Sequence, residues 1–357
     1  MNIGFVTHDF YAADGTGGYA VELVNRLARN HDVTLYAASI RSPVAEGVTV
    51  IRVPAVGASA YTRILTFPAG FASVRRKHDV VHAQGWVTRY ADVVTTHIVL
   101  AAWRDAARRA GVRSRPGERW LGGYVTARER DLFRRARVVI APSKRAATDV
   151  ARFYGRTRDV FVVHHGFPPA RNLPPRRSAR LGLGLPPDAF VALYAGDARK
   201  GLDRAISAVS RAPGVHLLVV SRSESTTYLE NAKSLGVSDR VHWAGGLDDI
   251  LPAYSAADVL LHPTIYDTFA MVVAEAMAYG VPVILTRDAG IADLVTDRAS
   301  GWIAGSDISD IVAGLLILKE DRSLRERVAL AGQKVASGRT WDDVVSETVA
   351  VYRKDVR

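Results

Sequence analysis

The sequence of 357 residues contains no cysteine. This excludes disulfide bonds, thiolate nucleophiles and zinc sites built on thiolates. No apolar run approaches the roughly 18–20 residues that a membrane-spanning helix requires. The chain begins directly with a strand-like run, Met1-Asn2-Ile3-Gly4-Phe5-Val6, without a basic leader. We therefore expect a soluble, cytoplasmic protein.

The composition is that of an ordinary globular protein, with 48% apolar and 23% charged residues. The length exceeds the usual size of one hydrophobic core, so two domains are expected. Six of the 15 prolines fall in residues 167–188, where a helix or a central strand is disfavoured. We therefore predict an N-terminal domain over 1–166, a linker over 167–188, a C-terminal domain over 189–338 and a final helix in 339–357 that returns to the N-terminal domain.

Short Val/Ile-rich runs alternate with amphipathic stretches in both halves. The strands expected in the first half are 3–7, 33–37, 48–53, 80–82, 92–96 and 138–141, with a helix over 17–30. Those expected in the second half are 190–194, 215–220, 241–243, 259–262 and 283–285, separated by helices over 202–212, 226–235, 250–256 and 272–279. This alternation predicts two Rossmann-like α/β domains with parallel sheets, and ligands at the carboxyl ends of the strands, in a cleft between the domains.

Positive charge is unevenly distributed in a chain whose net charge is +11. Eleven arginines and four acidic residues lie between Arg104 and Arg137. One interpretation is a solvated helical face. The other is a surface for an anionic acceptor or an anionic membrane, to which each basic residue contributes roughly 1 kcal/mol. Nucleic acid is not expected as a partner because no recognition motif accompanies the charge.

The densest polar constellation starts at His262 and includes Asp267 and Glu275. It reads as a strand end, a loop with one acid, and a helix with a second acid about two turns further on. The first N–H groups of that helix, at Ala270, Met271 and Val272, could hold a diphosphate. Alternatively, the two acids only stabilise the helix N-terminus electrostatically.

A second constellation, Ala195-Gly196-Asp197-Ala198-Arg199-Lys200-Gly201, follows a predicted strand and precedes a helix. Arginine binds phosphate oxygens in a bidentate manner and lysine acts as a point charge, so the pair suits a diphosphate. A basic pair in an ordinary turn is the alternative. A glycine-rich loop with Gly17 and Gly18 follows the first strand and would allow the backbone to approach a ligand closely.

The segment from Tyr266 to Ile284 resembles the signature of glycosyltransferase family 4, with seven residues between two acids and then an Ala-Met-Ala-x-Gly-x-Pro-Val pattern. The family usually has glutamate where this chain has Asp267. The run Ala198-Arg199-Lys200-Gly201-Leu202-Asp203-Arg204 resembles lipopolysaccharide-core hexosyltransferases of that family. The resemblance implies the two-domain GT-B fold and a retaining reaction.

The resemblance also implies individual roles. Glu275 is expected on the nucleotide ribose, Arg199 and Lys200 on the leaving diphosphate, and Asp267 with His97 on the donor sugar. The remaining donor-binding residues are expected to be Gly17, Gly18, Gly196, Thr268, Phe269, Ala270, Met271 and Val272. No Asp-x-Asp occurs, so we expect neither a metal nor another cofactor. The departing phosphate itself would accept the proton of the acceptor.

The expected function is transfer of a hexose or similar sugar from a UDP- or GDP-linked donor to a hydroxyl of a glycan, lipopolysaccharide, glycolipid or natural product. The alternatives are a nucleotide-sugar epimerase on the same fold and an inactive relative that binds membrane or nucleic acid. A peripheral position on the inner face of the cell membrane is an alternative to a purely cytoplasmic one.

Overall fold

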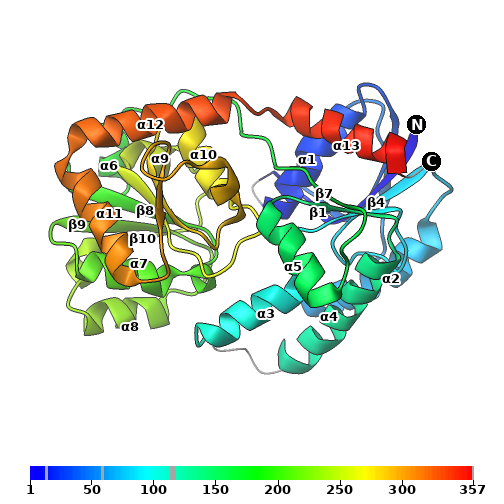
Figure 1. Ribbon diagram of the computed structural model, residues 1–357, viewed down its shortest axis with the longest axis horizontal. Coiled ribbons are helices and arrows are strands. Elements are labelled where there is room, and N and C mark those ends of the chain that lie inside the picture. Colours follow the sequence, from blue (N-terminus) through cyan, green and yellow to red (C-terminus); the bar gives the residue numbers. More distant parts are fainter. Residues whose placement is uncertain (13–14, 58–59, 113–117, 356–357) are drawn as a thin grey trace. The chain divides into compact units, whose positions relative to one another are not determined.

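The computed structural model describes residues 1–12, 15–57, 60–112 and 118–355. The chain divides into two compact units, one formed by residues 1–166 and 341–357 and the other by residues 167–340. Each unit is a parallel β-sheet flanked by helices (Figure 1). The prediction of two Rossmann-like α/β domains is therefore confirmed.

The first unit contains a seven-stranded parallel sheet within the described residues, in the order β3-β2-β1-β4-β5-β6-β7. Its strands are β1 Asn2–Phe10, β2 Asp32–Ile40, β3 Thr49–Arg52, β4 Val80–Gln84, β5 Val93–Thr95, β6 Val138–Ala141 and β7 Val160–Val162. Its helices are α1 Gly15–Leu27, α2 Ala60–Val74, α3 Leu100–Arg109, α4 Glu118–Arg135, α5 Lys144–Tyr154 and α13 Trp341–Asp355.

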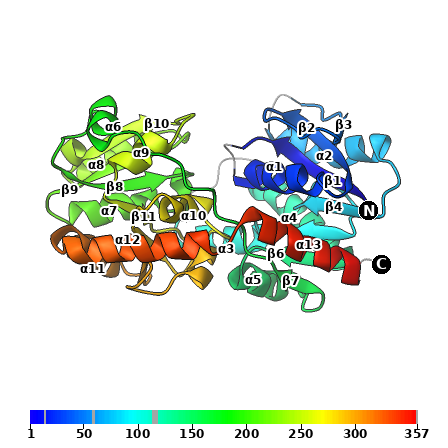
Figure 2. The same cartoon turned by 90° about the horizontal axis from the view of Figure 1, so that it is seen from above.

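Helix α13 ends the described chain and packs against α1 within this unit (Figure 2). Helix α1 buries Ala20, Leu23, Val24 and Leu27, at the three- and four-residue spacing of a helical face. The hydroxyl of Tyr352 on α13 lies 2.5 Å from Nδ1 of His82 on β4. Thus α13 contributes both apolar and polar contacts to the first unit.

The second unit contains a six-stranded parallel sheet within the described residues, in the order β10-β9-β8-β11-β12-β13. Its strands are β8 Phe190–Ala195, β9 Val215–Val220, β10 Val241–Gly245, β11 Val259–His262, β12 Val283–Thr286 and β13 Trp302–Ala304. Its helices are α6 Arg176–Gly182, α7 Leu202–Ser210, α8 Thr226–Ser234, α9 Leu251–Ala256, α10 Met271–Ala278, α11 Ile308–Glu320 and α12 Arg322–Ser337. The short 3₁₀ turns are η1 Ala198–Lys200, η2 Ser238–Arg240 and η3 Gly290–Leu294.

Strand β8 is buried on both faces because its side chains alternate between two cores. Val191 and Leu193 join one core with helices α6, α9, α10 and α12. Ala192 and Tyr194 join the other with α7, α8 and α11. Such two-sided burial explains the continuous apolar sequence of the strand.

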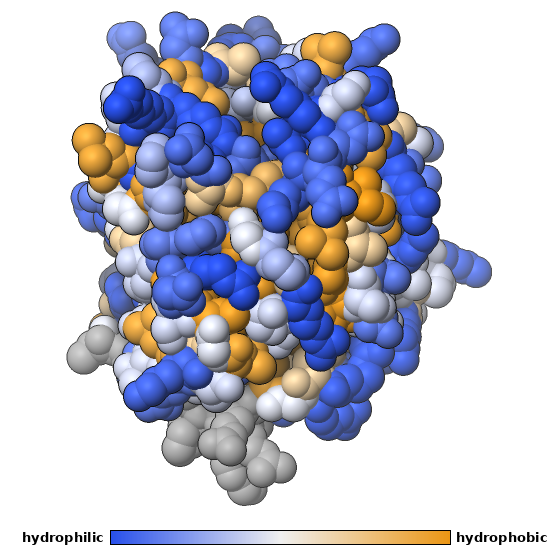
Figure 3. Space-filling model, turned by 90° about the vertical axis from the view of Figure 1, so that its left-hand side faces the viewer, coloured by the Kyte–Doolittle hydropathy of each residue, from blue (hydrophilic) through white to orange (hydrophobic). Residues whose placement is uncertain are grey.

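The exterior seen in Figure 3 is mostly hydrophilic over its described residues, with hydrophobic side chains in small groups.

Strand β8 pairs with β9 on one side and with β11 on the other. The chain order therefore reverses between β8 and β11, and the loops after these two strands leave the sheet in opposite directions. Ligands of open α/β sheets bind in the crevice at such a switch point. This topology places the loop 196–201 beside the loop 263–270.

The predicted linker over residues 167–188 is wrong in one respect, because this segment contains helix α6. The proline pairs flank the helix instead of interrupting it: Pro175 is its N-cap, and Pro186 follows after the helix has ended. Proline at a helix start costs little because the first N–H groups have no helical partner. The helix packs against α9, so the segment is part of the second unit.

Candidate functional site

The loop after β8 presents two cations at the carboxyl edge of the second sheet. Gly196 adopts a φ of 121°, a conformation that favours glycine, and turns the chain out of the strand. The Asp197 carboxylate then caps η1 by accepting a hydrogen bond from the Arg199 N–H at 2.9 Å. The Arg199 side chain folds back on Asp197, with Nη2 2.8 Å from Oδ2. Arg199 is 46% exposed, so its guanidinium is accessible from solvent.

Lys200 connects this loop to the loop after β11. Its Nζ donates to Oδ2 of Asp267 at 2.6 Å, and its carbonyl accepts from the N–H of Ile265 at 2.8 Å. Gly201 permits this close approach, because a Cβ there would clash with the carbonyl oxygen of Pro263. The two constellations recognised in the sequence therefore form one site.

Asp267 is held by hydrogen bonds on both oxygens. Oδ2 faces Lys200, and Oδ1 accepts from the N–H groups of Phe269 at 3.2 Å and Ala270 at 2.9 Å. Burial favours the neutral carboxyl, but the Lys200 ammonium and these hydrogen bonds outweigh it and keep the pKa of Asp267 below its usual range. The side chain is only 12% exposed. Asp267 is thus an ionised residue that positions Lys200 and the start of α10.

His262 ends β11 and lies close to the ion pair of Lys200 and Asp267. Its Nε2 is 3.8 Å from Oδ2 of Asp267 and has no hydrogen-bond partner among the described residues. Burial lowers the pKa of His262 to about 4, despite the opposing charge of Asp267. The ring is therefore neutral at pH 7 and does not compete with Lys200 as a partner of the carboxylate.

Helix α10 carries Glu275 and begins at an unusual backbone position. Its N-cap, Ala270, has a φ of 77° and no side chain that could cap the helix. The Glu275 side chain accepts a hydrogen bond from the Tyr254 hydroxyl at 2.6 Å, from α9. Burial raises the pKa of Glu275, and this hydrogen bond partly opposes the rise. An acceptor oxygen and a helix N-terminus, which favours anions, thus lie on one element.

The loop between β11 and α10 is also fixed from β12 and the turn after it. The N–H of Asp267 donates to the carbonyl of Asp288 at 3.0 Å, and the N–H of Gly290 donates to the carbonyl of Asp267 at 2.9 Å. The hydroxyl of Thr286 donates to the carbonyl of Thr264 at 2.6 Å. Thr268 and Phe269 lie in this loop and are largely buried. The loop is therefore preorganised and does not depend on a ligand for its shape.

The remaining predicted site residues belong to the first unit. A Cβ on Gly17 would lie 2.6 Å from the carbonyl oxygen of Tyr11, and one on Gly18 would lie 3.0 Å from that of Ala12. The start of α1 thus lies close to the backbone of Tyr11 and Ala12, which favours glycine at both positions. Residues 13–14 of the predicted loop lie outside the described residues. The predicted contact of Gly17 and Gly18 with the donor stays a prediction.

His97 follows β5 and belongs to a cluster of rings in the first unit. Its ring centroid lies 4.8 Å from that of Tyr19 and 5.7 Å from that of His165. Burial lowers the pKa of His97 to about 3, so its imidazole is neutral at pH 7. A neutral ring can donate or accept one hydrogen bond from a sugar hydroxyl, and this role also stays a prediction.

Sequence reasoning assigned no role to Asp197 and His262, although both lie in the two constellations, and it did not identify Tyr254. Asp197 was recognisable as a capping residue two positions before Arg199. Tyr254 gave no signal, because it lies 21 residues from Glu275 and on another helix. Among the described residues, no group of three or more histidine, aspartate or glutamate side chains is arranged to hold a metal ion. None of the described helices has the length and hydrophobicity to span a membrane.

Two family models match the chain. The model for glycosyl transferases group 1 matches residues 176–335, and that for glycosyltransferase family 4 matches residues 13–171. A D-inositol 3-phosphate glycosyltransferase of Xylanimonas cellulosilytica is 30% identical over 95% of this chain and 91% of its own length. An uncharacterized glycosyltransferase of Methanocaldococcus jannaschii is 25% identical over 99% of this chain and 98% of its own.

Solved structures show the same fold. WaaG, a glycosyltransferase involved in lipopolysaccharide biosynthesis, superimposes with a TM-score of 0.79 at 21% identity, covering 98% of this chain and 99% of its own. Anabaena HepE in complex with UDP and glucose gives a TM-score of 0.75 at 17% identity, covering 99% of both chains. The sheets, the matched models and the relatives agree: the chain is a glycosyltransferase that matches both the family 4 and the group 1 models, and it has the two-domain GT-B fold.

Proposed function

We propose that this glycosyltransferase transfers a sugar from a UDP- or GDP-linked donor to a hydroxyl group of an acceptor, with retention of the anomeric configuration. The observation that carries the proposal is the contact between Lys200 and Asp267, which places a cation beside the start of α10. The complexes of Anabaena HepE with UDP and with UDP-glucose support a uridine nucleotide in particular. A glycan, a lipopolysaccharide, a glycolipid or a small natural product would serve as acceptor.

In this proposal the diphosphate lies between the basic turn and the N-terminus of α10. Arg199 and Lys200 would stabilise the negative charge that develops as the bond between the anomeric carbon and the phosphate oxygen breaks. Glu275 would accept hydrogen bonds from ribose hydroxyls. Positive charge from these side chains would let the reaction proceed without a metal.

The acceptor oxygen would bond to the anomeric carbon on the face from which the diphosphate departs, and its proton would pass to a phosphate oxygen. Asp267 is poorly suited to be a covalent nucleophile, because both of its oxygens accept hydrogen bonds. Its engagement with Lys200 supports a positioning role next to the sugar. This argues for direct transfer over a double displacement through a glycosyl-enzyme.

The proposal is tested by thermal shift with UDP, GDP and dTDP on the wild type, Glu275→Ala and Arg199→Ala. Saturation at about 100 times the dissociation constant stabilises the fold by about 2.7 kcal/mol. We expect one diphosphate to raise the melting temperature of the wild type, with the effect reduced in both variants. No shift with any diphosphate would refute the donor site.

Stereochemistry is tested with the matching nucleotide sugar and water as the acceptor. Early ¹H NMR spectra distinguish the α and β anomers of the released sugar before mutarotation. Retention predicts that an α-linked donor first releases the α anomer, whereas the β anomer would refute the retaining mechanism. An epimerase would instead convert the nucleotide sugar without releasing a free sugar.

We further propose that α3 and α4 form a face for an anionic acceptor or membrane. Arg108, Arg109 and Arg135 have side chains that are 80%, 64% and 69% exposed. Tyr124 on α4 is 50% exposed and contacts Trp86 with a ring-centroid distance of 6.1 Å. Co-sedimentation with phosphatidylglycerol vesicles and with phosphatidylcholine vesicles tests the membrane alternative, since an electrostatic surface binds only the former and releases it at high salt.

A further inference from the structure

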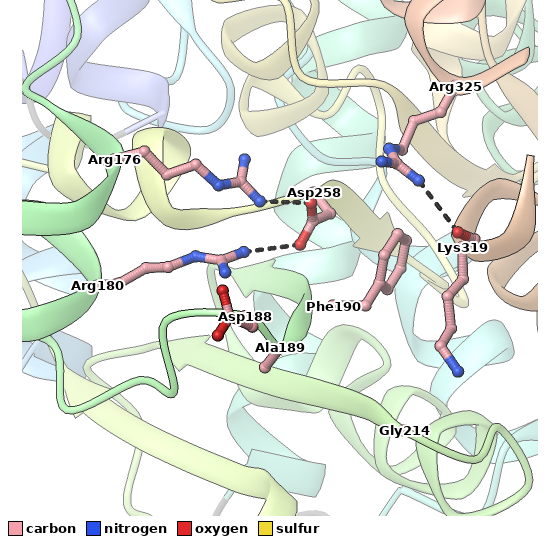
Figure 4. Close-up of a pocket in the computed structure, with 9 residues that line it drawn as sticks. All are labelled: Arg176, Arg180, Asp188, Ala189, Phe190, Gly214, Asp258, Lys319 and Arg325. Carbon is pink, nitrogen blue, oxygen red and sulfur yellow. Dashed lines mark hydrogen bonds and ion pairs between the residues drawn. The ribbon is translucent and has the colours of Figure 1, made fainter. Parts of the chain in front are cut away.

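A solvent-open pocket of about 360 Å³ lies at the amino edge of the second sheet (Figure 4). Its lining includes Phe190, the first residue of β8, together with Gly214 and Asp258, which immediately precede β9 and β11. The loops that carry Lys200 and Asp267 leave the opposite, carboxyl edge. The six residues of β8 separate the two edges by about 17 Å, at roughly 3.3 Å per residue. The pocket is therefore not part of the candidate donor site.

One wall of the pocket is an internally compensated ion cluster. Arg176 and Arg180 on α6 both contact the carboxylate of Asp258, with Nη2 of Arg180 2.8 Å from Oδ2 (Figure 4). The same Oδ2 accepts a hydrogen bond from the N–H of Val191 at 2.7 Å. Arg180 is only 4% exposed and also donates to the carbonyl of Ala256 at 3.1 Å. This wall is rigid, and its charges largely satisfy one another.

The facing wall carries two cations without a carboxylate partner among the described residues. Nζ of Lys319 donates to the carbonyl of Pro213 at 2.7 Å. Nη1 of Arg325 donates to the carbonyl of Leu318 at 2.6 Å. Carbonyl groups are neutral, so they orient these side chains without cancelling their charge. A guanidinium has five N–H donors and an ammonium has three, so both retain donors for a ligand.

The alternative interpretation of Arg325 is that it only caps the C-terminus of α11, whose last carbonyls it contacts. That role uses Nη1 and leaves Nε and Nη2 for other contacts. Helix capping by Arg325 also does not explain why Lys319 lines the same pocket, beside Gly214. Four cations and two carboxylates, Asp188 and Asp258, line the cavity, which leaves a formal excess of two positive charges.

We propose that this pocket binds a small phosphate monoester through the two cations of its facing wall, Arg325 and Lys319. A dianionic phosphate matches the excess of two charges, and arginine binds phosphate oxygens in a bidentate manner. The volume lies at the lower end of the range for small-molecule sites, roughly 300–1,000 Å³. It admits a phosphate with a short polyol or sugar attached. The exposed carboxylate of Asp188 can accept hydrogen bonds from the hydroxyl groups of such a ligand.

The test compares inorganic phosphate and glucose 6-phosphate as probes on the full chain, by thermal shift and by ³¹P NMR titration. The pocket variants are Lys319→Ala alone and Lys319→Ala with Arg325→Gln. The first retains the helix cap if the second proves unstable. Arg327→Gln with Lys334→Ala is the matched control, because both residues are exposed on α12 and outside the pocket lining.

Lys200→Ala separates this pocket from the donor site, which could also bind phosphate. We expect glucose 6-phosphate to bind the wild type, the control and Lys200→Ala alike, and its dissociation constant to rise at least tenfold in both pocket variants. Binding that Lys200→Ala abolishes, or that the pocket variants leave unchanged, would overturn the proposal. If the wild type binds neither probe, the proposal is overturned as well. None of these outcomes depends on whether UDP binds.

Discussion

Nζ of Lys200 lies 2.6 Å from Oδ2 of Asp267, and this contact joins two loops that are 67 residues apart in the chain. The cation assigned to the diphosphate and the acid assigned to the sugar are thus partners before any ligand binds. A diphosphate that engages Lys200 would share it with Asp267. The Asp267 carboxylate then fixes the position of the Lys200 ammonium. The site is therefore formed by the protein itself and is not assembled by the ligand.

Replacing Lys200 with alanine is expected to destabilise the second unit as well as to impair nucleotide binding. The change leaves the largely buried Asp267 carboxylate without its cation, at a cost of about 1–3 kcal/mol. Urea unfolding at pH 7 measures this loss. Lys233→Ala is the control, because Lys233 is exposed on α8 and should have a negligible effect.

The loss of unfolding free energy in Lys200→Ala should also depend on pH. The pKa of Asp267 is lowered in the folded protein, so its interactions stabilise the fold above the pKa of the unfolded chain and lose this effect as pH falls through the folded pKa. The difference between wild type and variant should therefore shrink at acidic pH. A difference that is equal at pH 7 and at a pH well below 3.8, the ordinary pKa of an aspartate, would mean that Lys200 acts through packing alone.

Alanine at Gly201 is expected to separate the two loops. The φ of 155° disfavours a side chain, and a Cβ would clash with the carbonyl of Pro263. We expect a loss of about 1–3 kcal/mol in stability together with weaker nucleotide binding. Gly182→Ala is the matched control, since Gly182 ends α6 and its Cβ would meet no atom within 4 Å. Equal unfolding free energies for the two variants would contradict the assigned role of Gly201.

Most of the fold was predictable because each domain repeats a simple pattern of buried strands and amphipathic helices. Strand β8 is a continuous apolar run and β9 is apolar except for His216, and their parallel pairing follows from that pattern. The three-residue strands β7 and β13 were missed because runs of this length do not show a period. Helix α6 was missed because proline was taken to exclude a helix where it only marks the start.

The site was predictable in its residue types and less so in its contacts. Local spacing identified Asp267, Glu275 and the basic pair, because these motifs are contiguous in sequence. The contact between Arg199 and Asp197 and that between Tyr254 and Glu275 depend on side-chain directions that no spacing reveals. The predicted approach of a ligand to the backbone at Gly17 stays a prediction, and a Cβ there would already clash with the carbonyl oxygen of Tyr11.

Removal of the Tyr254 hydroxyl should weaken nucleotide binding without unfolding the chain. The hydroxyl donates to Oε2 of Glu275 at 2.6 Å and so orients the carboxylate that we assign to the ribose. Loss of one such hydrogen bond costs about 1 kcal/mol, which corresponds to roughly a fivefold rise in the dissociation constant. Calorimetric titration of Tyr254→Phe with the preferred diphosphate measures it.

The control for Tyr254→Phe is Tyr279→Phe. The Tyr279 ring packs against Tyr254 with centroids 5.3 Å apart, yet no hydrogen bond of its hydroxyl is found among the described residues. The Tyr279→Phe variant should therefore bind the nucleotide like the wild type. Equal weakening in both variants would indicate that aromatic packing, and not orientation of Glu275, controls binding.

Glu129 in the first unit should make stability depend on pH near neutrality. This residue on α4 is only 3% exposed, and its Oε2 accepts hydrogen bonds from the N–H of Leu100 at 2.8 Å and from the hydroxyl of Tyr154. Glu129 thereby stabilises the start of α3, because the N-cap residue Val99 makes no side-chain hydrogen bond to the helix. Burial outweighs these hydrogen bonds and raises the pKa of Glu129 to about 7.

A carboxyl with a raised pKa binds its proton in the folded chain at pH values where the unfolded chain has released it. The contribution of Glu129 to stability is therefore greatest below the ordinary pKa of 4.5 and falls as pH rises to about 7, by up to about 3 kcal/mol. Urea unfolding at pH 5 and pH 8 should show this fall in the wild type and in Glu46→Gln, an exposed control in the same unit. Glu129→Gln keeps the acceptor for Leu100 but cannot ionise, so its stability should change least between the two pH values. An unchanged pH dependence in Glu129→Gln would mean that another group titrates in this range, and that the buried carboxyl is already ionised or still protonated throughout it.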